Sequence, residues 1–300
     1  VTTLNGDNTV YAKVNHKHSE LSLIYNFLYN DHRGLRSLET ADYTLNNGSH
    51  YLVTRNQTAG RSRHFANQLE IKYCLADSAT YVFQASLSTD GSNTPGNYAD
   101  YTYRDGTRER AFRTIDVASS FSPTLDLYFF HQLGKHQNIT ANVVGASIYT
   151  DKQGYNGEEG AYAYDVNGRT WSLLSEAIYE NKLKPFTFSV GLEHSMSFTN
   201  NEYTGDVSAL NKVRRGELYF FSQVKGRWKH LGYSAGVGVA NKTYSQGDNS
   251  FDYWTFRPKL TLSYEVLTGL SARYTFETYR RVSSYAMVSD ARIRENSREW

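Results

Sequence analysis

The stretch from Phe186 to Thr199, FTFSVGLEHSMSFT, alternates between two kinds of side chain. Its even positions carry Phe, Val, Leu, His and Met, whereas its odd positions carry Thr, Ser, Gly and Glu. A period of two predicts a β-strand with one apolar and one polar face. Phe186 and Phe198 end the apolar face, as is typical of strands that cross a bilayer between aromatic interfaces. Twelve steps of ~3.3 Å, tilted by ~40–45°, span roughly 28–30 Å, close to the ~25 Å apolar band of an outer-membrane barrel plus its aromatic rims.

The composition suits strands with lipid on one side and water on the other. The hydrophobic fraction is 39% and the mean hydropathy is -0.60, which is low for a soluble core, yet 25 residues are tyrosine. No run approaches the ~20 apolar residues of a transmembrane helix, so a helical inner-membrane protein is excluded. The net charge is only +2, and its 32 basic and 30 acidic residues are mixed along the chain, which gives no footprint for a nucleic-acid partner.

Similar alternating segments recur from Val10 to Glu277, and they predict about twelve strands with no helix. Short turns alternate with long polar stretches, which we interpret as loops, with the segment around 50–56 as a candidate extra hairpin. Transmembrane barrels have this asymmetry, whereas soluble sandwiches, the alternative, place long loops at both ends. The predicted fold is one antiparallel, up-and-down transmembrane β-barrel region over residues 1–300. The predicted long loops are 32–60, 89–110, 151–168 and 200–214.

Aromatic and charged positions sharpen this prediction. Three aromatic residues at the long-loop end of their strands and three at the short-turn end form two candidate membrane girdles. The loop-end residues are Trp171, Phe198 and Trp254, and the turn-end residues are Tyr179, Phe186 and Tyr264. Charged residues of the opposite parity are expected to face a wet lumen, where they cost little. They are Lys72, Asp126, Glu193, Arg257, Lys259, Arg273 and Glu277.

Tyrosines in the long polar stretches are the candidate ligand-binding residues. Aromatic rings at such positions can stack on sugars or hold peptides at little entropic cost. The alternative is that these rings belong to strand extensions and girdles. The candidates are Tyr98, Tyr101, Tyr103, Tyr155, Tyr162, Tyr164 and Tyr203.

No catalytic residue, metal ligand or cofactor is predicted. An outer-membrane hydrolase would need Ser, His and an acid within reach of one another, but the adjacent His194 and Ser195 point to opposite faces of a strand. His131 has no obvious serine partner. His16 and His18 would give two ligands of an incomplete metal site. The stretch 151–159 lacks the carboxylate spacing of a calcium loop, and Cys74 is the only cysteine.

The whole chain resembles the barrel of a TonB-dependent outer-membrane receptor of the Bacteroidota type. The resemblance rests on the alternating strands and on the segment Ser289–Trp300, SDARIRENSREW. It is similar to the stretch that, in such receptors, leads into a loop with a Gly-Asn-Pro-x-Leu-x-Pro motif and then into further strands. The resemblance implies a 22-stranded barrel of which this chain is about half. No plug domain and no closing strand are visible in the sequence, and Val1 implies a mature or truncated product.

The function implied by the resemblance is nutrient uptake without covalent chemistry. The expected partners are outer-membrane lipid, a small ligand (a glycan, peptide or metal chelate), a surface lipoprotein, and a periplasmic energy-coupling protein that acts through the plug domain. Two other classes stay open. One is a self-contained small barrel or adhesion protein with the tyrosine-rich loops as its surface, and the other is an outer-membrane hydrolase.

Overall fold

The computed structural model describes residues 2–77, 80–158, 161–206 and 208–278, and this part consists of strands and turns without a helix. No helix in these ranges is long and apolar enough to cross a membrane. Fourteen strands form one sheet. They are β1 (Thr2–His16), β2 (Ser19–Arg33), β3 (Ser37–Thr44), β4 (His50–Asp77), β5 (Tyr81–Asp105), β6 (Arg108–Gly134), β7 (Gln137–Asn156), β8 (Tyr162–Lys182), β9 (Phe186–Gly205), β10 (Ala209–Trp228), β11 (Leu231–Gln246), β12 (Asn249–Phe256), β13 (Lys259–Leu267) and β14 (Leu270–Glu277).

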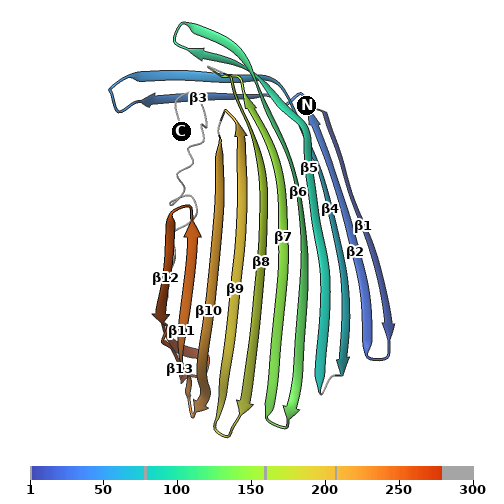
Figure 1. Ribbon diagram of the computed structural model, residues 1–300, viewed down its shortest axis with the longest axis vertical. Helices are drawn as coiled ribbons and strands as arrows, with labels where there is room; N and C mark the ends of the chain where they lie inside the picture. The colour runs from blue at the N-terminus through green and yellow to red at the C-terminus, as the bar shows by residue number, and fades with distance from the viewer. Residues whose placement is uncertain (1, 78–79, 159–160, 207, 279–300) are drawn as a thin grey trace.

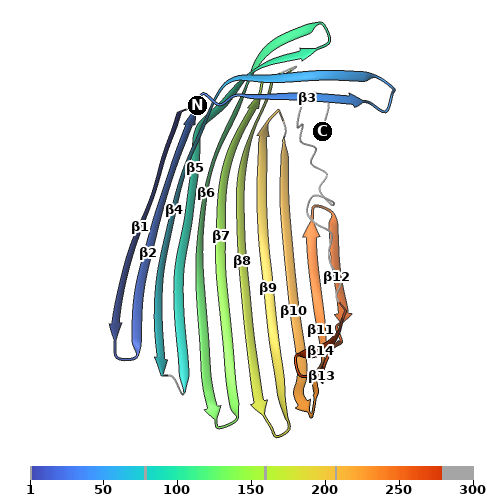
Figure 2. The same ribbon diagram turned by 180° about the vertical axis from the view of Figure 1, so that it is seen from behind.

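The sheet is an antiparallel meander, as predicted. Its main path runs β1-β2-β4-β5-β6-β7-β8-β9-β10-β11-β13-β14, with β3 paired to β4 and β12 paired to β11. Figures 1 and 2 show these strands side by side in one curved sheet that is not closed. Within the described ranges β1 pairs only with β2, and β14 only with β13. Closure by further strands of a 22-stranded barrel stays a prediction, and Ser289–Trp300 lies outside the described residues.

The sheet has fourteen strands, where the sequence predicts about twelve. One additional strand is β3, which pairs with the start of β4 from Ser37↔Gln57 to Thr44↔His50. The other results from a break at Pro258, which divides the predicted strand 254–264 into β12 and β13. Proline has no N–H to donate to the ladder, so pairing with β11 stops there and resumes at Lys259.

The predicted long loops are also wrong, because most of their residues belong to long strands. The stretch 89–110 is the paired outer part of β5 and β6, joined by a turn at Gly106 and Thr107. The stretches 151–168 and 200–214 are likewise outer parts of β7 to β10. Alternation of apolar and polar residues marks only a strand with an apolar face. Strands with two polar faces hydrogen-bond equally well and resemble loops in sequence.

β-Bulges bend the outer parts of β4 and β5. The register between them shifts between Gln57 and Ala59 and again between Arg61 and Phe65. The β5–β6 register shifts between Thr94 and Asn97, where Gly96 adopts φ +65°, a conformation that costs glycine little. Bulges bend the strand that carries them. In both views the β3–β4 and β5–β6 hairpins accordingly lean across the loop-side end of the sheet toward β9 to β11 (Figures 1 and 2).

The strand register separates the sheet into an apolar and a polar face, because directly paired residues point to the same side. One row of paired residues reads Leu21, Tyr73, Ala85, Leu127, Val143, Ser175, His194, Leu218 and Asn241. The neighbouring row on the other face reads Ser22, Lys72, Ser86, Asp126, Val144, Leu174, Ser195, Glu217 and Lys242.

Crowding identifies the polar face as the concave one. Gly191, Gly238 and Ala240 on this face are buried, although the sheet is a single layer. On the apolar face Val190 and Leu192 remain 43% and 37% exposed. Side chains converge on the inside of a curved sheet and diverge on its outside, so the apolar face is convex. The convex face thus exposes many large apolar side chains, and a contiguous exposed apolar patch marks an interaction site or a membrane contact.

Candidate functional site

A network of charges covers the concave wall at β10 to β14. The Glu217 carboxylate contacts Lys242 Nζ at 3.0 Å and Arg257 Nη1 at 3.2 Å. Glu277 in turn lies 3.8 Å from Arg257 and 3.5 Å from Lys259. Alternating carboxylates and cations across four strands satisfy one another, so this wall tolerates its charges beside a water-filled space.

Aromatic rings on the same wall lie flat over glycines of neighbouring strands. A Cβ at Gly191 would meet the Phe221 ring at 2.3 Å, and one at Gly238 would meet the Tyr219 ring at 2.4 Å. The Arg257 guanidinium lies 4.4 Å from the centroid of the Tyr219 ring, a cation–π geometry. The Tyr219 ring thus helps to position Arg257 on this wall.

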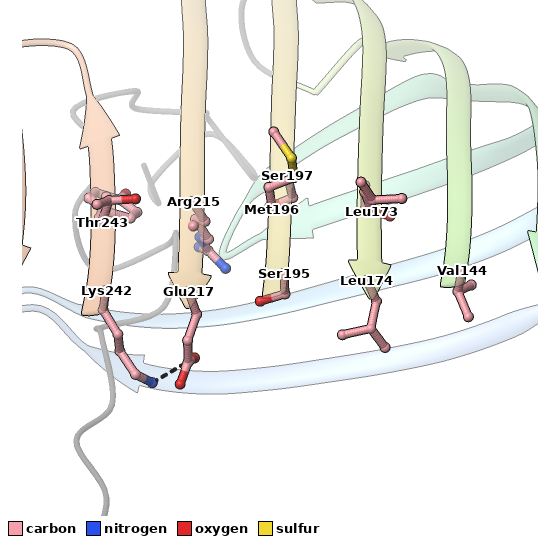
Figure 3. Close-up of a pocket in the computed structure, with 13 residues that line it drawn as sticks. Val144, Leu173, Leu174, Ser195, Met196, Ser197, Arg215, Glu217, Lys242 and Thr243 are labelled. Carbon is pink, nitrogen blue, oxygen red and sulfur yellow. Dashed lines mark ion pairs between the residues drawn. The ribbon is translucent and has the colours of Figure 1, made fainter. Parts of the chain in front are cut away.

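A recess of about 430 Å³ adjoins this network. Figure 3 shows Lys242 and Glu217 reaching toward each other beside Ser195 and Leu174, which come from neighbouring strands. The recess offers hydroxyl, carboxylate and ammonium groups next to aliphatic carbon. Apolar carbon beside a few polar groups is the usual lining of a ligand site in proteins.

Two further carboxylates on the concave wall oppose each other directly. Glu176 on β8 pairs with Glu193 on β9, and neither forms an ion pair in the described part of the chain. Like charges directly opposite in a sheet are destabilising. This position therefore favours contact with a cation from elsewhere in the protein or from solvent.

The strand register divides the seven candidate tyrosines between the two faces. Tyr98 and Tyr155 both pair with Ile115 and lie on the convex side. The other five continue the concave face beyond the apolar band. They are Tyr101, Tyr103, Tyr162, Tyr164 and Tyr203.

Four of the five concave tyrosines form two groups. Tyr101 stacks on Phe112 at 5.1 Å between ring centroids, and Tyr103 meets the same ring edge-on at 6.5 Å. Tyr162 and Tyr164 lie 5.7 Å apart. Tyr162 is 8% exposed, and its hydroxyl has no hydrogen-bond partner among the described residues. A buried hydroxyl without a partner is costly, so this group is suited to accept a polar contact from a ligand.

An arginine connects the overhanging hairpin to the next part of the wall. Arg55 of β4 lies 3.2 Å from the carboxylate of Glu158, which follows β7 and is 7% exposed. It also lies 3.8 Å from Glu39 and 6.0 Å from the Tyr103 ring centroid. These contacts hold the β3–β4 hairpin over the concave side.

On the convex face, the loop-side ends of β2 and β4 carry a buried carboxylate. Asp31 is 2% exposed. Arg61 and Arg33 donate hydrogen bonds to it at 2.7 and 2.8 Å, and these bonds hold the pKa of Asp31 far below its usual range. The Arg113 guanidinium likewise lowers the pKa of Asp100.

All six predicted girdle residues lie on the convex face. Trp171 and Phe198 are directly paired at the loop side, with ring centroids 5.7 Å apart. Trp254 pairs with Asn241 on the convex side of β11. The three turn-side residues begin or end the apolar rows of their strands. These are Tyr179, Phe186 and Tyr264. Their contact with a lipid interface stays a prediction.

The predicted separation of His194 from Ser195 agrees with the register, which pairs His194 with Leu218 on the convex face and Ser195 with Glu217 on the concave face. His131 packs beside Phe129 at 6.1 Å between rings. In the described ranges no three His, Cys, Asp or Glu side chains come together in a way that could hold a metal.

Sequence reasoning missed the concave aromatic residues Tyr219 and Phe221 and the Asp31 cluster. The facing of β10 is ambiguous in sequence because aromatic residues occupy both parities from Tyr219 to Phe221. The glycines of the neighbouring strands could have indicated the facing of Tyr219 and Phe221, because Gly191 and Gly238 leave room for a ring on the concave side. For Asp31 the signal is the change from Tyr29 to Asp31 at the end of an apolar row.

Comparison with known proteins gives a likeness in fold alone. No protein-family model and no curated protein sequence matches the chain. Among solved structures, the chain is similar to the ferric citrate transporter FecA in its unliganded form, with a TM-score of 0.50 and 13% sequence identity. The match covers 87% of this chain and 42% of that one, so the chain spans less than half the length of FecA. The likeness shows the fold alone: one antiparallel, up-and-down sheet that resembles part of a β-barrel wall.

Proposed function

We propose that this chain is part of the barrel wall of a TonB-dependent outer-membrane receptor that takes up a small nutrient. The observation that most supports this proposal is the continuous division of the sheet into an exposed apolar convex face and a charged concave face. Lipid solvates the first and a water-filled lumen solvates the second. The likeness to the fold of a ferric citrate transporter supports the same assignment.

In this proposal the cargo is a glycan, a peptide or a metal chelate that binds on the concave side. The two groups of concave tyrosines offer stacking surfaces, and the Tyr162 hydroxyl offers a hydrogen bond. The plug domain of the whole receptor occupies the lumen and connects the site to a periplasmic energy-coupling protein. A surface lipoprotein is a further candidate partner at the loop-side rim.

The first experiment tests membrane insertion of the full-length protein. Outer membranes are washed with alkaline carbonate and then extracted with detergent. We expect the protein to stay in the membrane through the carbonate wash and to leave it only in detergent. A protein that remains soluble and monomeric in buffer without detergent contradicts the proposal.

The second experiment tests energised uptake. Cells that express the full-length gene and cells that lack it are given radiolabelled glycan, peptide and chelate mixtures. The proposal predicts that at least one labelled class accumulates in a gene-dependent manner and that a protonophore abolishes the accumulation. Gene-dependent accumulation that persists in the protonophore would indicate a passive pore, and the TonB-dependent assignment would then fail.

A further inference from the structure

We propose that the convex face carries a binding site for the phosphate groups of an outer-leaflet phospho-glycolipid, built by Arg169, Lys212 and Arg214. This inference rests on the proposed function, because it requires the convex face to contact lipid and the loop side to face outward. It assigns a role to three cations that the transport proposal does not use.

The register places the three cations side by side just beyond the loop-side aromatic residues. Arg169 pairs with Asn200, which pairs with Lys212, so these two cations lie on one row of the convex face. Arg214 pairs with Phe198 on the row below, where Phe198 also pairs with Trp171. All three cations are exposed. They therefore stand at the level where lipid headgroups begin if the aromatic residues mark the interface.

The cations and aromatic residues line one recess of about 470 Å³. Trp171, Phe198 and Tyr149 form its apolar part, and the Arg214 guanidinium lies 5.6 Å from the Phe198 ring centroid. Such a surface matches an amphiphile: acyl chains can lie on the rings while anionic groups meet the cations above them. Arginine and lysine are suited to phosphate through charge-assisted hydrogen bonds.

The charge balance distinguishes this cluster from the other arginines at the convex rim. Arg33 and Arg61 bind Asp31, and Arg113 binds Asp100. In the described part of the chain, Arg169, Lys212 and Arg214 form no ion pair.

The nearest acids along the strands lie further from the apolar band. Asp151 and Glu202 both pair with Asn167, one row beyond Arg169 on the same face. Asp151 already accepts a hydrogen bond from Asn167 at 2.8 Å. The three cations thus form a cluster without a partner between an apolar surface and water, which fits an anionic headgroup.

The test uses the full-length protein in detergent and native mass spectrometry to count bound lipid. The probes are lipid A with two phosphates, lipid A without phosphates, and inorganic phosphate. The variant Arg169→Gln, Lys212→Gln, Arg214→Gln is compared with Lys135→Gln, Lys182→Gln, Lys184→Gln, which removes the same charge at the short-turn end, where all three lysines are exposed.

We expect the wild type and the short-turn variant to retain phosphorylated lipid A. The triple rim variant should bind it about two orders of magnitude more weakly, because each basic residue near an anionic surface contributes about fivefold. Lipid A without phosphates should bind to the wild type as weakly as phosphorylated lipid A binds to the triple rim variant. The single variant Arg214→Gln, expected to lose about fivefold, tests the site independently if the triple variant folds poorly.

Two results would overturn the inference. One is equal retention of phosphorylated lipid A by the wild type and the triple rim variant. The other is competition by millimolar inorganic phosphate as strong as that of the lipid, which would assign the cluster to a free anion. If the protein resists the carbonate wash and needs detergent, yet shows either of these results, the transport proposal stands and only this binding site is rejected.

Discussion

The middle of β9 and the outer half of β4 belong to one sheet, yet their convex faces differ. In the middle of β9 this face carries Val190 and Leu192, which are exposed. On outer β4 the same face carries Arg61, bound to the buried Asp31. The backbone ladder continues from one environment into the other. If the proposed function holds, the membrane boundary lies where the convex face changes from apolar to ion-paired side chains, and not where the strands end.

The largest effect is expected from a charge on the convex face. Leu192→Arg should lower the free energy of unfolding by about 2–4 kcal/mol, since it places a cation at the centre of the apolar band. Denaturant titration of the full-length protein in lipid vesicles measures this. The control Ser195→Arg puts the same side chain on the concave face, and it should cost about 0.5 kcal/mol or less. Equal costs for the two variants would abolish the distinction between the faces.

The next prediction concerns Asp31 and acid. Its pKa is lowered in the folded state by Arg61 and Arg33, so its contribution to stability is complete above the unfolded-state pKa of about 4. The contribution is lost as the pH falls below that value toward the folded pKa. Asp31→Asn should lower the melting temperature at pH 7 and flatten its decline between about pH 4 and pH 2. An unchanged melting temperature at pH 7 would contradict this role.

The third prediction addresses the loop-side aromatic pair. Trp171 and Phe198 should be coupled by about 0.5–1.5 kcal/mol in a double-mutant cycle with alanine, the range for aromatic contacts beyond simple burial. Denaturant unfolding in vesicles measures the four free energies. A coupling of zero would mean that the two rings do not act together at the interface.

The smallest effect is local. Arg55→Gln should remove the contact with Glu158 and speed amide hydrogen exchange in β3 and the start of β4, while global unfolding stays nearly unchanged. The control is Arg104→Gln, which breaks an exposed pair with Glu109 at the tip of the β5–β6 hairpin. If both variants exchange like the wild type, the hairpin is held by backbone pairing alone.

Sequence predicted the fold wherever one face is apolar. The alternation of Phe186 to Phe198 predicts the strand, and the parity of Lys72, Glu193 and Lys259 correctly groups them on one face. It failed where both faces are polar, as in outer β5 and β6, because such strands lack an apolar period. The candidate tyrosines were found by residue type alone. The faces of Tyr98, Tyr101 and Tyr103 depend on the bulge near Gly96, which alternation cannot locate.

The most direct test of the account is solvent accessibility along β9. In a Cys74→Ser background, nitroxide labels are attached at Val190→Cys, Leu192→Cys, Glu193→Cys and Ser195→Cys in the full-length protein in vesicles. We expect high accessibility to oxygen at positions 190 and 192 and to a water-soluble nickel complex at positions 193 and 195. Equal accessibility to the nickel complex at all four positions would contradict the claim that lipid covers the convex face.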